Sequence, residues 1–375
     1  MSKTTKEIPY TELVERVISI SRANQSSIEK VRGIVQDIYT RDIPIKYDWN
    51  FLFSSSSIVT TSEYITGNAS VNTGSRVVSF STDAVMIDSM NRRRIKFSGD
   101  STVYEITSFY SANSLQISPE FSGTTNISNG SYSIFQPVYA LANDFDRFPK
   151  DGGLYKWNGG NKYILMEEPY QEYAENYTGS PSVPEKIRIV GSDTAGNTLI
   201  EMSPPPKDAR IYNYDYLRSL SPMAETSAGH IQTINARATG VTGYTTTRFI
   251  DAKTDNNVRN FLRVDILGRS HDSSWYPILA ITHDSSVTLK TAFANTAITS
   301  SASYVISNSP EIPSMLHPAI LYGAIASVMA DQNDENAVIY FGRYAQVLSD
   351  AKRIYVSRVY SQDIHGVHEE WDYRR

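Results

Sequence analysis

The chain contains no cysteine among its 375 residues. This absence excludes a disulfide framework, a thiolate metal site and a cysteine nucleophile, and it fits synthesis in a reducing compartment. Long apolar runs are also missing. The N-terminus lacks the apolar stretch of a signal peptide, and the longest largely apolar run, 318–330, is too short to cross a bilayer. We therefore expect no membrane insertion and interpret 318–330 as a buried helix.

Catalytic motifs and a basic surface are missing as well. The sequence has no nucleophile elbow, no P-loop and no zinc-protease motif. Its net charge is −5, so the chain as a whole lacks the excess of basic residues that proteins use to bind nucleic acid. We expect a protein that is not an enzyme and that binds no cofactor.

Tyrosine is abundant, with 25 residues against 13 phenylalanines and 4 tryptophans. A tyrosine combines an apolar ring with a polar hydroxyl, so it suits surfaces that become interfaces. Proteins rich in β-structure favour tyrosine too, so its abundance indicates assembly without proving it.

Helices are expected at both ends of the chain, where apolar residues recur at helical spacing. The four helical segments predicted in this way are 11–20, 26–38, 319–329 and 334–358. Pro44 is expected to end the N-terminal pair, because proline lacks a backbone N–H. Between the ends, short runs rich in Ser, Thr, Val, Ile and Tyr alternate with turns, as in small all-β units.

An internal repeat is the most informative feature of this β-rich region. Residues 101–134 align without gaps to 273–306, and ten of the 34 positions are identical. Upstream, an offset of 169 pairs Gly74 with Gly243, Ile95 with Val264 and Phe97 with Ile266, with the extra residues placed in the loop 271–274. The repeat predicts two related small domains that resemble β-barrels.

The expected fold class is α+β: a helical bundle formed from the N- and C-terminal helices, with two related small β-barrel-like domains inserted. The region between them contains a strand pair, 186–190 with 198–202, and a strand whose tyrosines lie on one face, 211–216. The expected segments are the N-terminal helices (1–56), the first barrel (57–140), a β-rich connection (141–231), the second barrel (232–310), the C-terminal helices (311–358) and a docking tail (359–375).

Several motifs together resemble the head-to-tail adaptor, or connector, proteins of tailed bacteriophages. They are YDWNFL at 47–52, YALANDFDR at 139–147, PEKIRIVG at 184–191, the three prolines 204–206 before the tyrosine strand, and 312–318 before two last helices that include Tyr344. The second motif is similar to a Leu-Pro-x-Asp-Phe stretch of that family, but Ala142 stands where the pattern has proline. The second barrel also makes this chain longer than a minimal adaptor.

The resemblance implies a structural virion protein in the phage neck, made in the host cytoplasm. It implies a ring of about twelve copies beneath the portal protein, joined on its other side to tail or nozzle proteins, with DNA passing through the central channel. The acidic charge balance is compatible with DNA that slides without binding tightly.

Two other functions stay open. One is a tail-side structural protein such as a nozzle, tube or baseplate component. The other is a receptor-binding or carbohydrate-binding virion protein, because small β-barrels with exposed aromatic residues also bind sugars.

Two groups of residues are candidate contact sites. Arg92, Arg93 and Arg94 form the densest basic cluster and are expected to contact DNA in the channel or a neighbouring ring, the alternative being a solvated hairpin turn. The expected interface with the portal or with a neighbouring subunit consists of residues near the C-terminus, the alternative being a disordered end. These residues are Tyr355, Tyr360, His368, Trp371, Tyr373, Arg374 and Arg375.

No metal site is predicted. His365 and His368 stand near the C-terminus beside a glycine, a context expected to make a poor rigid metal site. Asp144 and Asp146 are expected to accept backbone hydrogen bonds instead of holding calcium. The segment 331–342 resembles the start of an EF-hand loop but lacks its glycine and its final glutamate.

Overall fold

The computed structural model describes residues 7–23, 27–150, 152–158, 161–168, 179–227, 230–244, 259–264, 274–283, 285–299 and 301–356. The chain divides into two compact units. One unit comprises 1–52 together with 219–375, and the other comprises 53–218. No helix among the described residues is long and apolar enough to cross a membrane.

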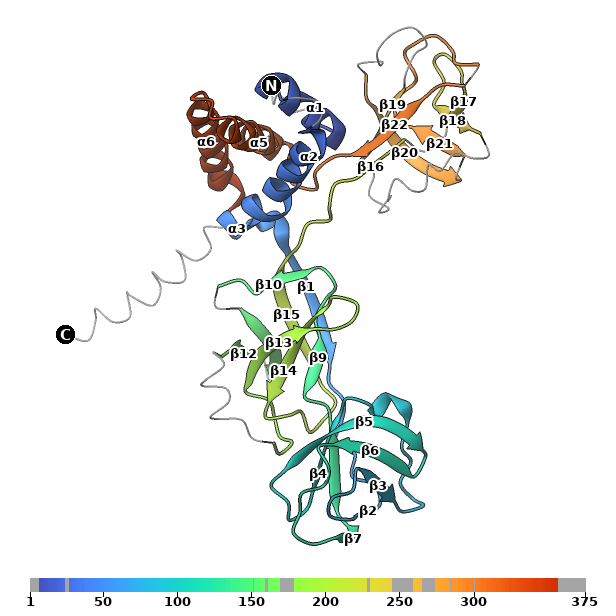
Figure 1. Ribbon diagram of the computed structural model, residues 1–375, viewed down its shortest axis with the longest axis vertical. Coiled ribbons are helices and arrows are strands. Elements are labelled where there is room, and N and C mark those ends of the chain that lie inside the picture. Colours follow the sequence, from blue (N-terminus) through green and yellow to red (C-terminus); the bar gives the residue numbers. More distant parts are fainter. Residues whose placement is uncertain are drawn as a thin grey trace, which may run out of the picture. The chain divides into compact units, whose positions relative to one another are not determined.

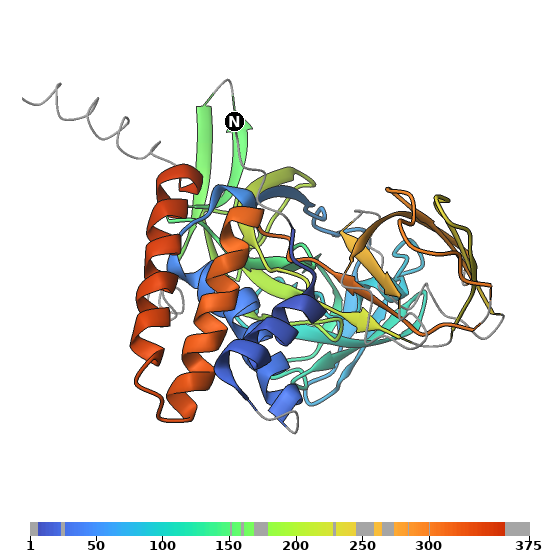
Figure 2. The same cartoon turned by 90° about the horizontal axis from the view of Figure 1, so that it is seen from above.

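Helices from both ends of the chain pack together in the first unit (Figures 1 and 2). They are α1 (Tyr10–Ser21), α2 (Ile28–Asp37), α3 (Ile43–Lys46), α5 (His317–Asp331) and α6 (Ala337–Tyr355). α5 contacts α1, α2 and α6, which explains why it is apolar on nearly every side. Each of the four segments expected to be helical therefore contains a helix, but the last one is shorter than expected, because α6 begins at Ala337 and ends at Tyr355.

Pro44 does not end the N-terminal helices, contrary to the sequence-based expectation. A π-turn, Ile38–Asp42, follows α2 directly and leads into α3, with Pro44 in its first turn. Proline is tolerated there because the first residues of a helix have no intrahelical N–H bond to lose. The helix ends instead at Lys46, and the backbone of the next residue, Tyr47, is extended.

The expected fold class, a helical bundle carrying two small inserted β-barrel-like domains, is wrong. The described residues hold 22 strands in three sheets, so the protein is mostly β. The stretch expected to be a connection, 141–231, supplies most strands of the largest sheet. Helical periodicity is a local signal, so the sequence indicates the terminal helices clearly. Short strands depend on pairing with distant partners, so the sequence understates the share of β-structure.

The largest sheet, which we call the central sheet, belongs to the second unit and has the strand order β1-β15-β11-β12-β13-β14-β9, with β10 also paired to β15. Within this sheet β12 and β13 are parallel, and the other described strand pairs are antiparallel. The strands are β1 (Phe53–Val59), β9 (Val138–Ala140), β10 (Phe145–Arg147), β11 (Gly153–Asn158), β12 (Asn161–Glu167), β13 (Lys186–Ser192), β14 (Thr198–Ser203) and β15 (Ile211–Arg218). As expected, β13 pairs with β14, and Tyr212, Tyr214 and Tyr216 share the buried face of β15.

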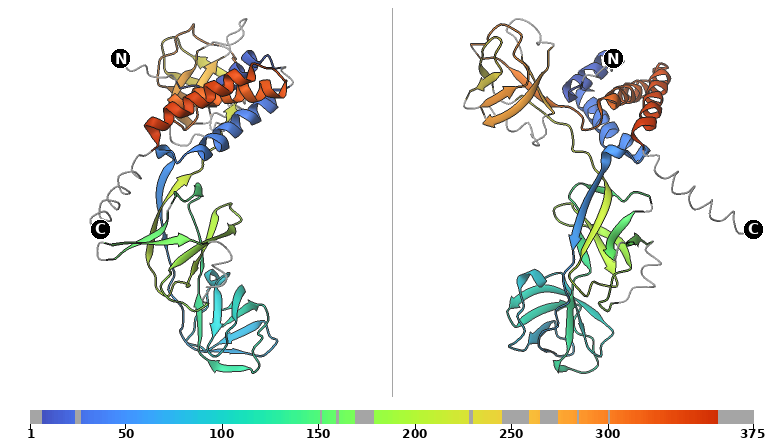
Figure 3. Two further views of the ribbon diagram at one scale, coloured as in Figure 1. Left: turned by 90° about the vertical axis from the view of Figure 1, so that its left-hand side faces the viewer. Right: turned by 180° about the vertical axis from the view of Figure 1, so that it is seen from behind.

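Each of the other two sheets has seven strands and curls into a half-barrel (Figures 1 and 3). The first half-barrel adjoins the central sheet in the second unit. It contains β2 (Ala69–Val71), β3 (Val77–Phe80), β4 (Arg94–Phe97), β5 (Val103–Ser111), β6 (Ser114–Ser118), β7 (Ile127–Gly130) and β8 (Tyr132–Phe135). The second half-barrel, in the first unit, contains β16 (Glu225–Thr226), β17 (Ile231–Ile234), β18 (Gly240–Gly243), β19 (Asn260–Val264), β20 (Tyr276–His283), β21 (Ser286–Leu289) and β22 (Tyr304–Asn308).

The two half-barrels share one strand order. The path β2-β3-β6-β5-β4-β8 in the first matches β17-β18-β21-β20-β19-β22 in the second, and each sheet adds one further strand at an end. In both, a tyrosine hydroxyl inside the curl accepts a backbone N–H eighteen residues further along, Ser122 to Tyr104 and Ala294 to Tyr276. The gapless repeat in the sequence therefore corresponds to a repeated topology.

Upstream of that repeat, the residue pairing expected from the sequence is wrong. Ile95 lies between Tyr104 and Ile134, and the residue between the equivalent Tyr276 and Ile306 is Leu262, not Val264. A single offset fails because the extra residues are divided between two connections, one before β19 and one after it.

Gly74 likewise corresponds to Arg237 and not to Gly243. Both have a left-handed backbone, with φ of 77° and 61°. Both donate their backbone N–H to the carbonyl of an equivalent phenylalanine, Phe121 or Phe293.

Candidate functional site

The three arginines expected to contact DNA or a neighbouring ring lie at the start of β4. Arg92 is exposed and has a left-handed backbone suited to a turn. Arg93 is half-buried, and this burial lowers the pKa of its guanidinium. The Nη1 atom of Arg94 lies 2.6 Å from Oε1 of Glu201. The structure thus separates the three side chains into different environments, with Arg92 the exposed member of the cluster.

Glu201 forms a buried ion-pair centre between the first half-barrel and the central sheet. Its side chain is 2% exposed, and its second oxygen, Oε2, lies 2.6 Å from Nη2 of Arg188. Arg94 comes from β4, whereas Glu201 and Arg188 face each other across β13 and β14. A buried carboxylate is stable only when paired, so this cluster has a structural role.

Of the residues expected to form the C-terminal interface, the structure describes Tyr355 in the last turn of α6. Its ring meets that of Phe51 edge to face, with centroids 5.9 Å apart. The remaining residues of that prediction lie outside the described residues: Tyr360, His368, Trp371, Tyr373, Arg374 and Arg375. His365, considered above for metal binding, lies outside them too.

The aspartates considered for calcium binding take part in other contacts. Asp144 accepts a hydrogen bond of 2.6 Å from the Tyr216 hydroxyl, and Asp146 pairs with Arg147. Within the described ranges, no group of three or more metal-ligating side chains comes together.

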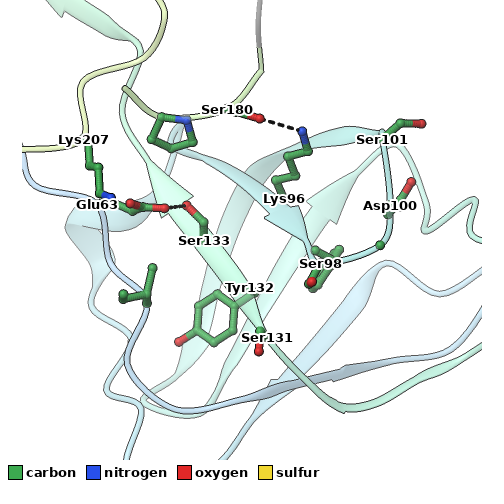
Figure 4. A pocket seen from close by; sticks show the side chains of 14 residues that line it. Glu63, Lys96, Ser98, Asp100, Ser101, Ser131, Tyr132, Ser133, Ser180 and Lys207 are labelled. Atoms are coloured by element: carbon green, nitrogen blue, oxygen red, sulfur yellow. Dashed lines mark hydrogen bonds between the residues drawn. The ribbon is translucent and has the colours of Figure 1, made fainter. Parts of the chain in front are cut away.

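An open cavity of about 620 Å³ lies on the outer face of the first half-barrel (Figure 4). We call it the Lys96 cavity. Its polar lining comes from β4, β8, the turn after β4, and segments near residues 63, 180 and 207. The labelled lining residues are Glu63, Lys96, Ser98, Asp100, Ser101, Ser131, Tyr132, Ser133, Ser180 and Lys207.

Two opposite charges flank strand β8 in this cavity. Lys96 lies on β4, opposite Ser133, and its Nζ donates a 3.0 Å hydrogen bond to Ser180. Glu63 precedes Tyr64, which pairs with Ile134 from the other side of β8, and the Glu63 carboxylate accepts a hydrogen bond from Ser133. The cavity therefore offers a cation and a carboxylate on either side of one strand.

The second half-barrel carries the same pair of charges in equivalent positions. Arg263 of β19 lies opposite Val305, as Lys96 lies opposite Ser133. Glu225 precedes Thr226, which pairs with Ile306 as Tyr64 pairs with Ile134. Both charges line a smaller cavity of about 300 Å³.

In the second half-barrel, side chains of the N-terminal helices α1 and α2 bind both Arg263 and Glu225. Both terminal nitrogens of Arg263 lie 2.7 Å from the Glu15 carboxylate of α1, and Trp275 stacks on the guanidinium. Glu225 accepts hydrogen bonds from Thr11 of α1 and from Arg32 of α2. A carboxylate thus binds the cation and a guanidinium binds the carboxylate, which are charge-assisted contacts.

Sequence reasoning missed this common feature. Glu63 and Glu225 are separated by an offset that differs from both offsets found in the repeat, because the loops between the strands differ in length. The sequence did contain one signal: β4 and β19 each carry a charged residue at the equivalent position, Lys96 and Arg263. The offset of 169 does not align these two residues, so the sequence comparison did not reveal it.

A second surface feature is the exposed side of α6 near its start. The exposed fractions of Val338, Ile339 and Phe341 are 74%, 55% and 44%. Gly342 and Ala345 are exposed beside them, so this α6 apolar face continues over about two turns. The opposite side of α6 carries the buried Ala351.

Comparison with known proteins adds no relative, since neither the models of known families nor the curated proteins contain a match to this chain.

Proposed function

We propose that the chain is a structural, non-enzymatic protein of the virion neck of a tailed bacteriophage: a head-to-tail adaptor that forms a ring beneath the portal and surrounds the DNA channel. The observation that carries the proposal is the α6 apolar face. A helix on the surface of a monomer normally presents polar residues to water, so three large exposed apolar side chains indicate a surface that another protein covers.

A second copy of the chain is the occupant that this function requires. Subunits of a closed ring bury one surface patch against another, repeated around the axis. A patch on a helix that packs on the buried α5 has the rigid support that a repeated interface needs. The motifs that resemble the adaptor family support the same function, since one of them, 312–318, leads directly into α5.

The test is to mix the purified full-length protein with the portal ring of the same phage and image the product by negative-stain electron microscopy. We expect a second ring stacked on the portal. The variant V338E/F341E should leave the portal bare while its circular dichroism and melting remain unchanged. The matched control is Ile354→Glu, which changes an exposed apolar residue near the end of α6, outside that face, and should still form rings.

Two results would contradict the adaptor function. If portal rings stay bare while the protein assembles on tail proteins, the chain is a tail-side component. If it binds a cell-surface glycan and neither of these, it is a receptor-binding protein.

A further inference from the structure

We infer that the Lys96 cavity of the first half-barrel is the docking site for the C-terminal segment, residues 357–375, of a neighbouring copy of this chain. The inference rests on the proposed function, because a ring places identical copies side by side. It goes further by naming the receiving surface, the occupant and the contacts between them.

The duplicated topology provides the first argument. The second half-barrel shows what its outer pair of charges does: Arg263 holds a carboxylate and Glu225 holds a guanidinium, both from polypeptide segments. Lys96 and Glu63 repeat that pair, with the same signs in the same strand positions. The first half-barrel therefore has a cation and a carboxylate placed to bind a segment that carries a carboxylate and a guanidinium.

The equivalent surface of the first half-barrel is more open. The Lys96 cavity is about twice as large as its counterpart, 620 Å³ against 300 Å³. Lys96 donates a hydrogen bond to Ser180, and Glu63 accepts one from Ser133. Asp100 and Lys207 line the same cavity. Burial acts to raise the pKa of Asp100, but hydrogen bonds from Thr102 and Tyr104 together with the Lys96 charge outweigh it and lower that pKa. A carboxylate and a guanidinium arriving there would give Lys96 and Glu63 oppositely charged partners in addition to the two serine hydroxyls.

The C-terminal segment has suitable charges. Since α1 and α2 already bind the second half-barrel, an occupant supplied by this protein would come from another part of the chain. The last residues read Glu370-Trp-Asp372-Tyr-Arg374-Arg375, with carboxylates directly before arginines. The segment also supplies tryptophan and tyrosine, which anchor many interfaces.

The spacing of these charges matches the cavity. Lys96 and Glu63 lie on the two neighbours of β8, so their strands are about 10 Å apart, which is twice the distance between adjacent strands. Residues two or four positions apart in an extended segment share a face and lie about 7 or 13 Å apart. In an extended segment Arg374 would lie about 7 Å from Asp372 and about 13 Å from Glu370, on either side of the required distance of about 10 Å. The flexibility of the side chains can accommodate the remaining difference.

Cross-linking of the full-length protein tests the contact directly, because the chain has no cysteine of its own. One variant carries Ser131→Cys in the cavity, and the other carries Tyr373→Cys in the C-terminal segment. The two are mixed with portal rings and oxidised mildly. We expect a disulfide-linked dimer whose S131C–Y373C junction is identified by mass spectrometry. Ser128→Cys is the matched control, since it is exposed on the same half-barrel outside the cavity, and it should not cross-link.

Charge reversal then tests the recognition. Lys96→Glu in the S131C protein should lower the cross-linking yield about fivefold or more, and E370K/D372K in the partner protein should restore it. Arg76→Glu, an exposed change on the same half-barrel outside the cavity, should leave the yield unchanged.

The outcomes separate this inference from the proposed function. Rings on the portal without the S131C–Y373C junction would overturn the docking site alone. A junction that forms within single chains of an S131C/Y373C double variant would show that the segment binds its own chain, which contradicts the neighbouring copy. Bare portals without the junction would overturn both proposals.

Discussion

Arg94 Nη1 and Glu201 Oε1 lie 2.6 Å apart, so a residue of the basic cluster that the sequence suggested for DNA contact is bound to a buried carboxylate. The pair joins β4 of the first half-barrel to β14 of the central sheet. Arg188 holds the other oxygen of the same carboxylate. The three residues form the polar centre of the contact between these two sheets.

Replacing Glu201 with alanine should therefore destabilise the protein strongly. The substitution leaves Arg94 and Arg188 without their shared anion, and breaking a buried pair in this way costs about 3 kcal/mol. Denaturant unfolding followed by fluorescence would measure the change. Asp208→Ala removes an exposed pair with Arg210 and should change the unfolding free energy by less than about 1 kcal/mol. Equal effects of the two substitutions would show that the Glu201 cluster is not stabilising.

The buried imidazole of His317 should make stability depend on pH. Its Nδ1 accepts the Ile8 N–H, its Nε2 lies 3.2 Å from the Ile312 carbonyl, and burial together with the nearby charge of Arg259 lowers its pKa to about 4. The neutral ring is thus favoured in the folded state. Its contribution is fully present above the unfolded pKa of about 6.5 and is lost as pH falls toward 4.

We expect the unfolding free energy to fall by about 2 kcal/mol from this group between pH 7.5 and pH 5. Denaturant titrations at both pH values would measure the fall. The variant His317→Gln keeps hydrogen-bonding atoms but does not titrate, so its loss over the same interval should be smaller by that amount. A variant with the same pH dependence as the natural chain would contradict the assignment.

The helices and the gapless part of the repeat could be predicted from the sequence because both signals are local. Apolar spacing within 319–329 defines a helix without reference to any partner. The central sheet could not be predicted in this way, because β1 pairs with β15 across most of the second unit, starting with Phe53 opposite Leu217. Nothing in either strand alone specifies the other.

The candidate site was hidden for a related reason. The arginines 92–94 stand out as a run, but the sequence does not show that Glu201 lies beside one of them. The equivalence of Lys96 and Arg263 requires the correct register of β19, and two loops of unequal length conceal that register. The equivalence becomes visible only in the structure, where Lys96 pairs with β8 and Arg263 pairs with β22.

Two glycines of the C-terminal helices should respond differently to alanine. At Gly323 in α5, a new Cβ would lie 3.2 Å from Ile38 Cδ1 and from the Tyr344 ring, whereas at Gly342 in α6 it meets nothing within 4 Å. Gly342→Ala should raise the unfolding free energy by about 0.5–1 kcal/mol through helix propensity. At Gly323 the crowding offsets that gain, so we expect no increase or a loss. Thermal melts of the two variants would decide; an equal rise in both would show that α5 has room beside Ile38.

The duplicated turns before β3 and β18 permit a reciprocal test at Gly74 and Arg237. Both have a left-handed backbone, which glycine adopts freely and which costs a residue with a Cβ about 1 kcal/mol. Gly74→Ala should lower the unfolding free energy by about that amount, and the cause must be the backbone, because the new Cβ meets nothing within 4 Å. Arg237→Gly should relieve the same strain and raise stability, partly offset by the greater freedom of glycine in the unfolded chain. Denaturant unfolding of each variant should give changes of opposite sign. Changes of the same sign would mean that the two turns are not equivalent, and the match between the half-barrels would then end at β3 and β18.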